Sequence, residues 1–198
     1  MSAEDAAAAA GSPGSARRAE LLALAYEYVL ERGLAGLALR PLAAATGTSP
    51  RVLLYLFGSK EGLVRELLAR AREDQLTLVR NDLDNAEMHD IGDVTEAVWR
   101  VLAAPERRGL VRLVYEAFIM SVQPDPGPWE GFATEQISDW LALLRSAQRE
   151  ANSRQAEIRA TRELAVIRGL LLDLLATGDN DRVTRALGQQ RAPGRPGK

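Results

Sequence analysis

Residues 40–60 of this chain read RPLAAATGTSPRVLLYLFGSK, a stretch in which helix stops and helix starts follow one another closely. A first short helix is expected at about 41–46, and Gly47 ends it because glycine readily adopts the left-handed conformation found after helices. Ser49 and Pro50 predict the start of the next helix, since a serine hydroxyl caps free backbone N–H groups and proline fits the first helical turn.

The same signals recur at the end of this second helix. Gly58 is expected to stop it, and Ser59 is expected to cap a long third helix that begins near Lys60. Two helices joined by so short a turn form a helix-turn-helix, so this stretch predicts that motif.

The second helix of the motif has two chemically different faces. At about 100° per residue, Leu53 and Phe57 lie on one side, and Arg51, Val52 and Tyr55 lie opposite them. Arginine can donate two hydrogen bonds to guanine, valine can contact a thymine methyl group, and tyrosine can reach a phosphate or a base edge. The outward face therefore suits a DNA major groove, although an exposed helix of any small helical domain is the alternative.

Residues from about Arg17 to Arg80 resemble the N-terminal DNA-binding domain of the TetR (tetracycline-repressor) family of bacterial transcription regulators. The matching positions are Ala25, Gly33, Arg40, 42–47, Ser49, Pro50, Leu53 and 57–63. The resemblance implies an all-α fold, in which an N-terminal three-helix head with the helix-turn-helix is joined to a larger helical body for ligand binding and dimerisation.

The chain departs from the family pattern at four positions. Ala38 stands where the family usually has Thr, and Thr48 stands where it has Val. Leu54 and Leu56 replace residues that are usually Tyr, and His or Tyr, so the family's aromatic and imidazole contacts to phosphate are missing there. The candidate DNA-contacting residues are Arg40, Thr48, Ser49, Arg51, Val52, Tyr55 and Lys60.

The composition is that of an ordinary globular protein, with 46% hydrophobic and 26% charged residues among 198. No apolar stretch reaches the length of a bilayer span, and the acidic, alanine-rich N-terminus is unlike a signal peptide, so we expect a cytoplasmic location without a membrane partner. The absence of cysteine excludes disulfides, thiol catalysis and cysteine-ligated metal.

The charge is distributed unevenly along the chain. Residues 17–80 carry 10 basic and 7 acidic side chains, a net charge of +3, whereas residues 81–198 carry 15 and 18, a net charge of −3. A mildly basic head on a mildly acidic body is consistent with nucleic-acid contact by the head alone.

Apolar periodicity and turn residues divide the chain into segments. Helices are expected at about 17–32, 60–80, 91–104, 106–122, 129–151 (starting at Trp129 or Phe132), 153–176 and 179–188. The expected domains are a disordered tail at 1–16, a DNA-binding domain at 17–62, an effector-binding and dimerisation domain at 63–188, and a disordered tail at 189–198.

The body is expected to hold a small apolar effector. The helix at 106–122 is apolar nearly all round, so it should lie in the middle of the body with aromatic residues of neighbouring helices beside it. Ordinary core packing is the alternative. The candidate ligand-binding residues are Leu67, Ala71, Trp99, Tyr115, Phe118, Ile119, Trp140 and Leu144.

The body is also expected to form a homodimer. The segment 164–175 is apolar over most of its circumference, more than one body would cover, and the family resemblance points to the same helices. The alternative is that it is the central core helix of a single body. The candidate interface residues are Leu164, Ile167, Leu171, Leu174 and Leu175.

Signals for catalysis are thin. The only histidine, His89, lies in a polar loop, and the chain has no glycine-rich phosphate loop, so neither an enzyme nor a metal or cofactor site is expected. The sequence therefore predicts a DNA-binding transcriptional regulator, a repressor that binds a palindromic operator as a homodimer and is released by a small apolar effector. The alternative is an all-α ligand-binding or structural protein without DNA contact.

Overall fold

The computed structural model describes residues 13–84, 90–148 and 151–191, and the elements within these ranges are all helical, as the sequence predicts. They are α2 (Pro13–Arg32), α3 (Leu39–Ala45), α4 (Pro50–Phe57), α5 (Lys60–Leu83), α6 (Ile91–Leu102), η1 (Pro105–Arg107), α7 (Arg108–Ser121), η2 (Gly127–Trp129), α8 (Phe132–Ser146), α9 (Arg154–Thr177) and α10 (Asn180–Arg191).

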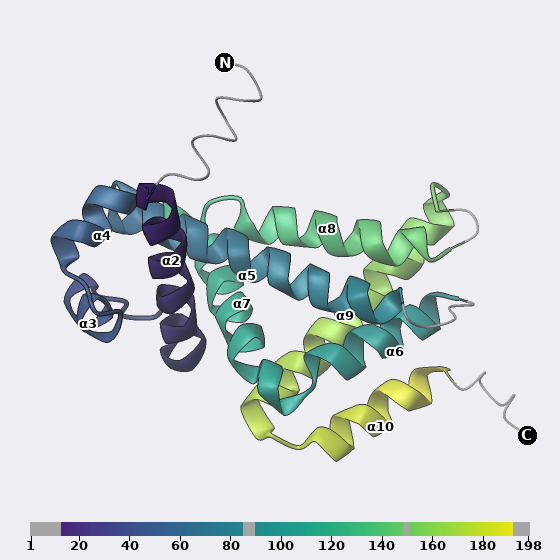
Figure 1. Ribbon diagram of the computed structural model, residues 1–198. Coiled ribbons are helices and arrows are strands. Elements are labelled where there is room, and N and C mark those ends of the chain that lie inside the picture. Colours follow the sequence, from purple (N-terminus) through teal and green to yellow (C-terminus); the bar gives the residue numbers. More distant parts are fainter. Residues whose placement is uncertain (1–12, 85–89, 149–150, 192–198) are drawn as a thin grey trace, which may run out of the picture.

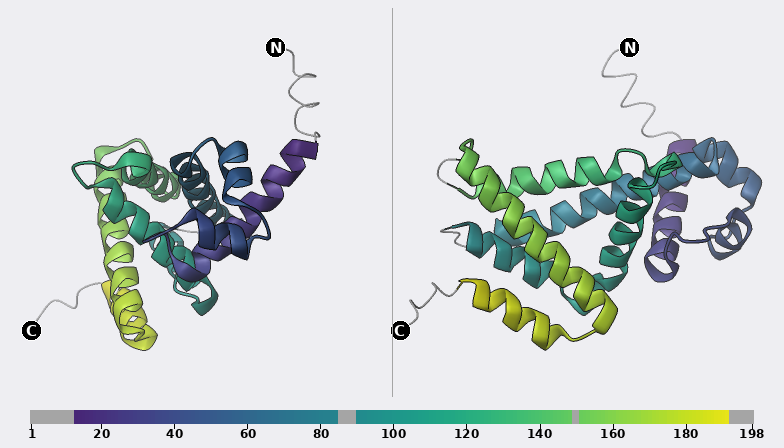
Figure 2. Two further views of the ribbon diagram at one scale, coloured as in Figure 1. Left: turned by 90° about the vertical axis from the view of Figure 1, so that its left-hand side faces the viewer. Right: turned by 180° about the vertical axis from the view of Figure 1, so that it is seen from behind.

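The helices form a small head and a larger body (Figure 1). Helices α2, α3 and α4 make the head, and α5 runs from the head into the body, where α6 and α8 lie against it. Figure 2 shows α9 running diagonally across the body, with α10 folded back beneath it. The head and the body are thus joined by one continuous helix, as expected.

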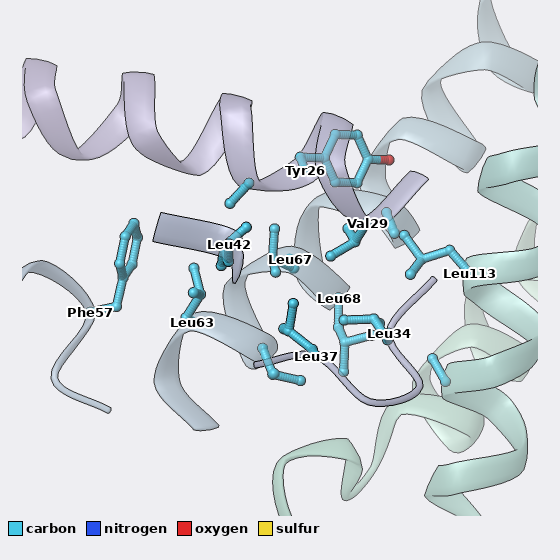
Figure 3. Packing of buried hydrophobic residues seen from close by; sticks show 14 of the residues in the cluster. Tyr26, Val29, Leu34, Leu37, Leu42, Phe57, Leu63, Leu67, Leu68 and Leu113 are labelled. Atoms are coloured by element: carbon cyan, nitrogen blue, oxygen red, sulfur yellow. The ribbon is translucent and has the colours of Figure 1, made fainter. Parts of the chain in front are cut away.

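The core of the head forms where α2, α3, α4 and α5 meet. Leu42 and Leu53 from the helix-turn-helix are fully buried, and Phe57 is nearly so, which agrees with the face predicted to point inward. Figure 3 shows Val29 of α2 and Leu67 of α5 in this core, which continues to Leu113 of α7. Helix α7 therefore packs on the head as well as on the body.

A second core fills the body between α5, α6, α8, α9 and α10. Val98 and Leu144 are fully buried there, and Val183 anchors α10 to the same core. Trp99 is also buried, and its indole N–H donates a hydrogen bond of 3.0 Å to the hydroxyl of Thr184 on α10. This bond satisfies the polar end of an otherwise apolar ring and ties α10 to α6.

Several helix boundaries differ from those expected. Helix α2 begins at Pro13, so residues 13–16 belong to the helix and not to the tail, because proline fits the first helical turn. Helix α10 continues past residue 188 to Arg191. The rest of the two expected tails, residues 1–12 and 192–198, lies outside the described residues, as does His89.

Helix α7 is less buried than its composition predicts. Its first half packs into both cores, but Ile119 near its end is 56% exposed and the following Val122 is 59% exposed. The expectation of a fully central helix is therefore wrong for its last turn. No helix in the described ranges is both long and apolar enough to cross a membrane.

Candidate nucleic-acid interface and internal pocket

The turn signals of residues 40–60 have the expected geometry. Gly47 has φ of +65° after α3, and the Ser49 hydroxyl accepts a hydrogen bond of 3.3 Å from the Val52 amide at the start of α4. The Ser59 hydroxyl likewise accepts one of 3.0 Å from the Gly62 amide and so caps α5. Local capping chemistry thus fixes both ends of the turn that presents α4.

The outward face of α4 is exposed. Arg51 is exposed, Val52 is 37% exposed and Tyr55 is 86% exposed, while Arg40 on α3 and Lys60 at the start of α5 are also exposed. The salt bridges found among the described residues involve none of the three cations Arg40, Arg51 and Lys60. Within the described ranges these three charges thus form no ion pair and can act on an external anion.

Two of the predicted DNA-contacting residues, Thr48 and Ser49, already make hydrogen bonds within the turn. Thr48 is half-buried, and its amide donates a hydrogen bond of 2.9 Å to the Ala43 carbonyl at the end of α3. Ser49 is exposed but uses its hydroxyl as the α4 cap. Leu54, one of the positions that departs from the family pattern, is 41% exposed and places an apolar side chain on this surface.

Arg18 on α2 holds the far end of α4, a role that the sequence analysis missed. Its guanidinium lies 5.2 Å from the centre of the Phe57 ring, donates to the Leu56 carbonyl at 3.2 Å and pairs with Glu66 on α5. An arginine can cap free carbonyl groups at a helix end in this way. No local sequence pattern predicts this contact, because Arg18 is 38 residues from Leu56.

The body contains a cavity of about 940 Å³ that reaches from the head to the interior of the body. Helix α5 contributes Val64 and Gln75 to its wall, and η2 contributes Trp129. Four of the eight predicted ligand-binding residues lie in the wall: Tyr115, Phe118, Ile119 and Trp140. The volume is within the range of drug-sized ligand sites.

The other four predicted ligand-binding residues do not line the cavity. Leu67 and Ala71 are fully buried in the core shared by the head and α7, and Leu144 is fully buried in the core of the body. Trp99 faces α10 through its bond to Thr184. Periodicity placed these side chains on inward helix faces but could not distinguish a filled interior from a hollow one.

The inward face of α9, expected to pair two copies, is occupied within the chain. Leu164, Ile167, Leu171 and Leu174 are at most 6% exposed and Leu175 is half-buried, and all but Leu174 line the cavity. These five residues therefore do not form a free outer surface. The exposed residues of α9 recur at helical spacing on its outer face: Ile158, Ala165, Gly169, Leu172 and Ala176. Two of them, Gly169 and Leu172, also line the cavity.

Polar side chains in the cavity wall are linked by hydrogen bonds. Arg168 of α9 lies 3.4 Å from the Gln136 carbonyl oxygen, and the Gln136 amide donates to Gln75 of α5 at 3.0 Å. The Tyr115 hydroxyl donates to the backbone carbonyl of Arg168, and burial raises the pKa of this phenol to about 12. Burial also lowers the pKa of the Arg168 guanidinium, and the Arg168 guanidinium lies 4.9 Å from the centre of the Phe118 ring.

Helix α7 joins this cavity to the head. Arg112 donates hydrogen bonds of 2.8 Å and 2.7 Å to the carbonyls of Leu30 and Glu31 at the end of α2. One turn further on, the Glu116 carboxylate accepts a hydrogen bond of 2.6 Å from the Leu34 amide. Both side chains also line the cavity, so the same helix contacts the end of α2 and the space inside the body.

The fold and the exposed face define a helix-turn-helix protein with a separate helical body. Residues 21–67 match the family described as bacterial regulatory proteins, tetR family. The HTH-type transcriptional regulator BetI of Rhizobium meliloti (strain 1021) is 25% identical over 154 residues, which cover 75% of this chain and 60% of that protein. The match thus spans less than two thirds of that relative. The helix-turn-helix part of the chain is therefore similar to the tetR family of bacterial regulatory proteins.

Solved structures share the whole fold. A transcriptional regulator from Rhodococcus sp. Rha1 has a TM-score of 0.72 at 20% identity, with 87% of this chain and 92% of that chain covered. The multidrug binding protein EbrR complexed with proflavin has a TM-score of 0.62 at 24% identity, with 87% and 98% covered. The head and body architecture is therefore common to these proteins.

Proposed function

We propose that this chain is a transcriptional regulator, a repressor that binds a palindromic operator as a homodimer and is released by a small effector. The observation that carries the proposal is the exposed α4 face with Arg51, Val52 and Tyr55, flanked by Arg40 and Lys60 without ion-pair partners among the described residues. A helix of this composition, held by caps at both neighbouring turns, matches the donors and apolar contacts of major-groove recognition.

Base recognition and phosphate contact are assigned to different residues. Arg51 at the second position of α4 is proposed to reach base edges. Lys60 at the capped start of α5 is proposed to contact phosphate together with free backbone N–H groups. Loss of Arg51 should therefore change which sequence is bound, and loss of Lys60 should weaken binding to all sequences.

The test begins with selection of bound sequences from random duplex DNA, followed by binding titrations at several salt concentrations. Arg51→Ala is expected to cost about 1–3 kcal/mol of discrimination at one base pair, and Lys60→Ala to reduce the salt slope by about 1. Arg159→Ala removes one exposed charge from α9 and serves as the control. If no sequence is enriched, or if Arg51→Ala and Lys60→Ala bind like the control, the alternative of a helical protein without DNA contact is favoured.

The homodimer is proposed to form through the outer face of α9. Leu172 is 54% exposed and Ile158 is 44% exposed, on the same face as the small residues Ala165 and Gly169, which let a second helix approach closely. A two-fold pair of heads would read two half-sites, so we expect a palindromic operator.

Light scattering tests the dimer directly, because the monomer mass is 21.5 kDa. We expect twice this mass for the wild type and the monomer mass for Leu172→Glu. Leu24→Glu alters an exposed leucine on α2 in the head and should leave the dimer intact. A monomeric wild type at micromolar concentration would remove this part of the proposal.

The effector is proposed to act through both helices that line the cavity and contact the head. Helix α5 begins at Lys60, and its Val64 and Gln75 lie in the cavity wall. On α7, Tyr115 lies between the two residues that bind the end of α2 and the following turn, Arg112 and Glu116. A ligand releases DNA only if it binds more tightly to the head spacing that does not fit the operator.

A further inference from the structure

We propose that the cavity of the body binds an organic anion, a carboxylate on an apolar and partly aromatic skeleton, through Arg168. This inference rests on the effector pocket of the proposed function and names the chemical class of its ligand. It is carried by a half-buried arginine that has no acidic partner among the described residues and by the direction of the hydrogen bonds that run from it.

Arg168 is a cation in a mostly apolar wall. Its neighbours in the wall include Phe118, Ile167, Leu171 and Leu172, and its guanidinium lies 4.9 Å from the centre of the Phe118 ring. No salt bridge found within the described ranges involves Arg168. A partly buried charge without a counter-charge is unfavourable, and binding of an anion would relieve that cost.

The hydrogen bonds around Arg168 have one possible direction. Arginine is a donor only, so the atom of Gln136 next to it is the carbonyl oxygen, at 3.4 Å. The NH2 group of Gln136 must then donate to the carbonyl of Gln75, at 3.0 Å. This leaves the Gln75 NH2 group and the other guanidinium N–H groups as donors, and Gln75 and Gln136 are only 3% and 4% exposed.

The Tyr115 hydroxyl does not supply an acidic partner. It donates to the backbone carbonyl of Arg168, and burial raises the pKa of this phenol, so it stays neutral at ordinary pH. The carboxylates in the cavity wall are Glu61 and Glu116, and Glu116 is bound to the Leu34 amide at the head. Lys60 and Arg112 also line the cavity, and Arg112 is bound to the carbonyls at the end of α2. The part of the wall around Arg168 therefore offers donors and a positive charge, which an acceptor with a negative charge satisfies best.

The experiment compares three ligands of one skeleton with the purified protein: 6-phenylhexanoate and the alcohol and the amine with the same carbon chain. Binding is followed by calorimetry and by the fluorescence of Trp129 and Trp140, which line the cavity. The wild type should bind the carboxylate at least about tenfold more tightly than the alcohol, because hydrogen bonds to charged groups are the strong ones. The amine should bind most weakly.

Variants of the arginine identify its role. Arg168→Met keeps most of the side-chain length but removes the charge, so it should bind the carboxylate no more tightly than the alcohol. Arg168→Lys should retain part of the preference. Arg162→Met, an exposed arginine on the same helix, should bind all three ligands like the wild type.

Three results would overturn the inference: equal or tighter wild-type binding of the alcohol or the amine, a carboxylate preference that survives in Arg168→Met, or no binding of any of the three. None of these measurements contains DNA, so each of them leaves the proposal of DNA binding untouched. Conversely, a chain that binds no DNA can still show the carboxylate preference.

Discussion

Two glycines in the connection between α2 and α3 give a sharp test of the contact between α7 and the head. Gly33 and Gly36 both have a positive φ, of +79° and +77°. A methyl group at Gly36 would meet nothing within 4 Å, whereas one at Gly33 would lie 2.6 Å from the Oε1 atom of Glu116. The two alanine variants therefore share the backbone strain and differ in the contact with Glu116.

The expected magnitudes follow from these two terms. Left-handed strain costs about 1–2 kcal/mol for a non-glycine residue, and stiffening of the unfolded chain offsets about 0.4–1 kcal/mol, in both variants alike. At Gly33 the carboxylate must also move, which breaks its 2.6 Å bond to the Leu34 amide. A hydrogen bond to a charged group contributes about 1.5–3 kcal/mol, so Gly33→Ala should be less stable than Gly36→Ala by about this amount.

Urea denaturation followed by tryptophan fluorescence and by helical circular dichroism measures this difference. In thermal denaturation it corresponds to about 3–12 °C, at about 2–4 °C per kcal/mol for a chain of this size. In a Glu116→Ala background the extra cost of Gly33→Ala should disappear, because the group that it displaces is gone. Equal destabilisation by the two glycine substitutions, or additive effects of Gly33→Ala and Glu116→Ala, would refute the reasoning.

Two further stability predictions concern single hydrogen bonds. Burial raises the pKa of the Tyr115 phenol from 10.0 to about 12, so this group adds stability below about pH 10 and loses it as the pH rises to about 12. The wild type should be more stable than Tyr115→Phe, partly because of the hydrogen bond to the Arg168 carbonyl. This advantage in the free energy of unfolding should be smaller in denaturation measurements at about pH 11 than at about pH 9. Ser59→Ala should lower the free energy of unfolding by about 1 kcal/mol, because the hydroxyl caps α5 at the Gly62 amide. Ser138→Ala, at an exposed position inside α8, should change it little. Equal effects of the two serine changes would contradict the assigned cap.

The head was predictable because its signals are local. Ser49 and Ser59 cap the helices that directly follow them, and Leu53 and Phe57 take the buried face that a 100° rotation per residue assigns to them. Each of these predictions needs only a few neighbouring residues. Arg18, which supports the same helix from α2, could not be found in this way because its contact depends on how the helices cross.

The body was predicted in outline but not in its surfaces. A helix such as α9, apolar over most of its circumference, has one apolar face for its own core and one for any partner, and sequence alone does not say which face is which. Leu164 and Ile167 turned out to face inward, which leaves Ile158 and Leu172 for the outer surface. The sequence likewise could not distinguish a cavity from ordinary core packing, because a hollow interior and a filled one have the same apolar pattern.

The route from the cavity to the head also changes the expected mechanism. A single connecting helix, α5, would transmit a ligand-induced tilt only through its own rigid-body movement. Helix α7 adds a second connection: Arg112 holds the carbonyls at the end of α2, and Glu116 holds the amide of Leu34 that follows. A ligand against Tyr115 and its neighbours would act on α7 within one turn of both bonds. Because α2 also carries Arg18, which supports the end of α4, this second connection reaches the proposed DNA-contacting helix without passing through α5.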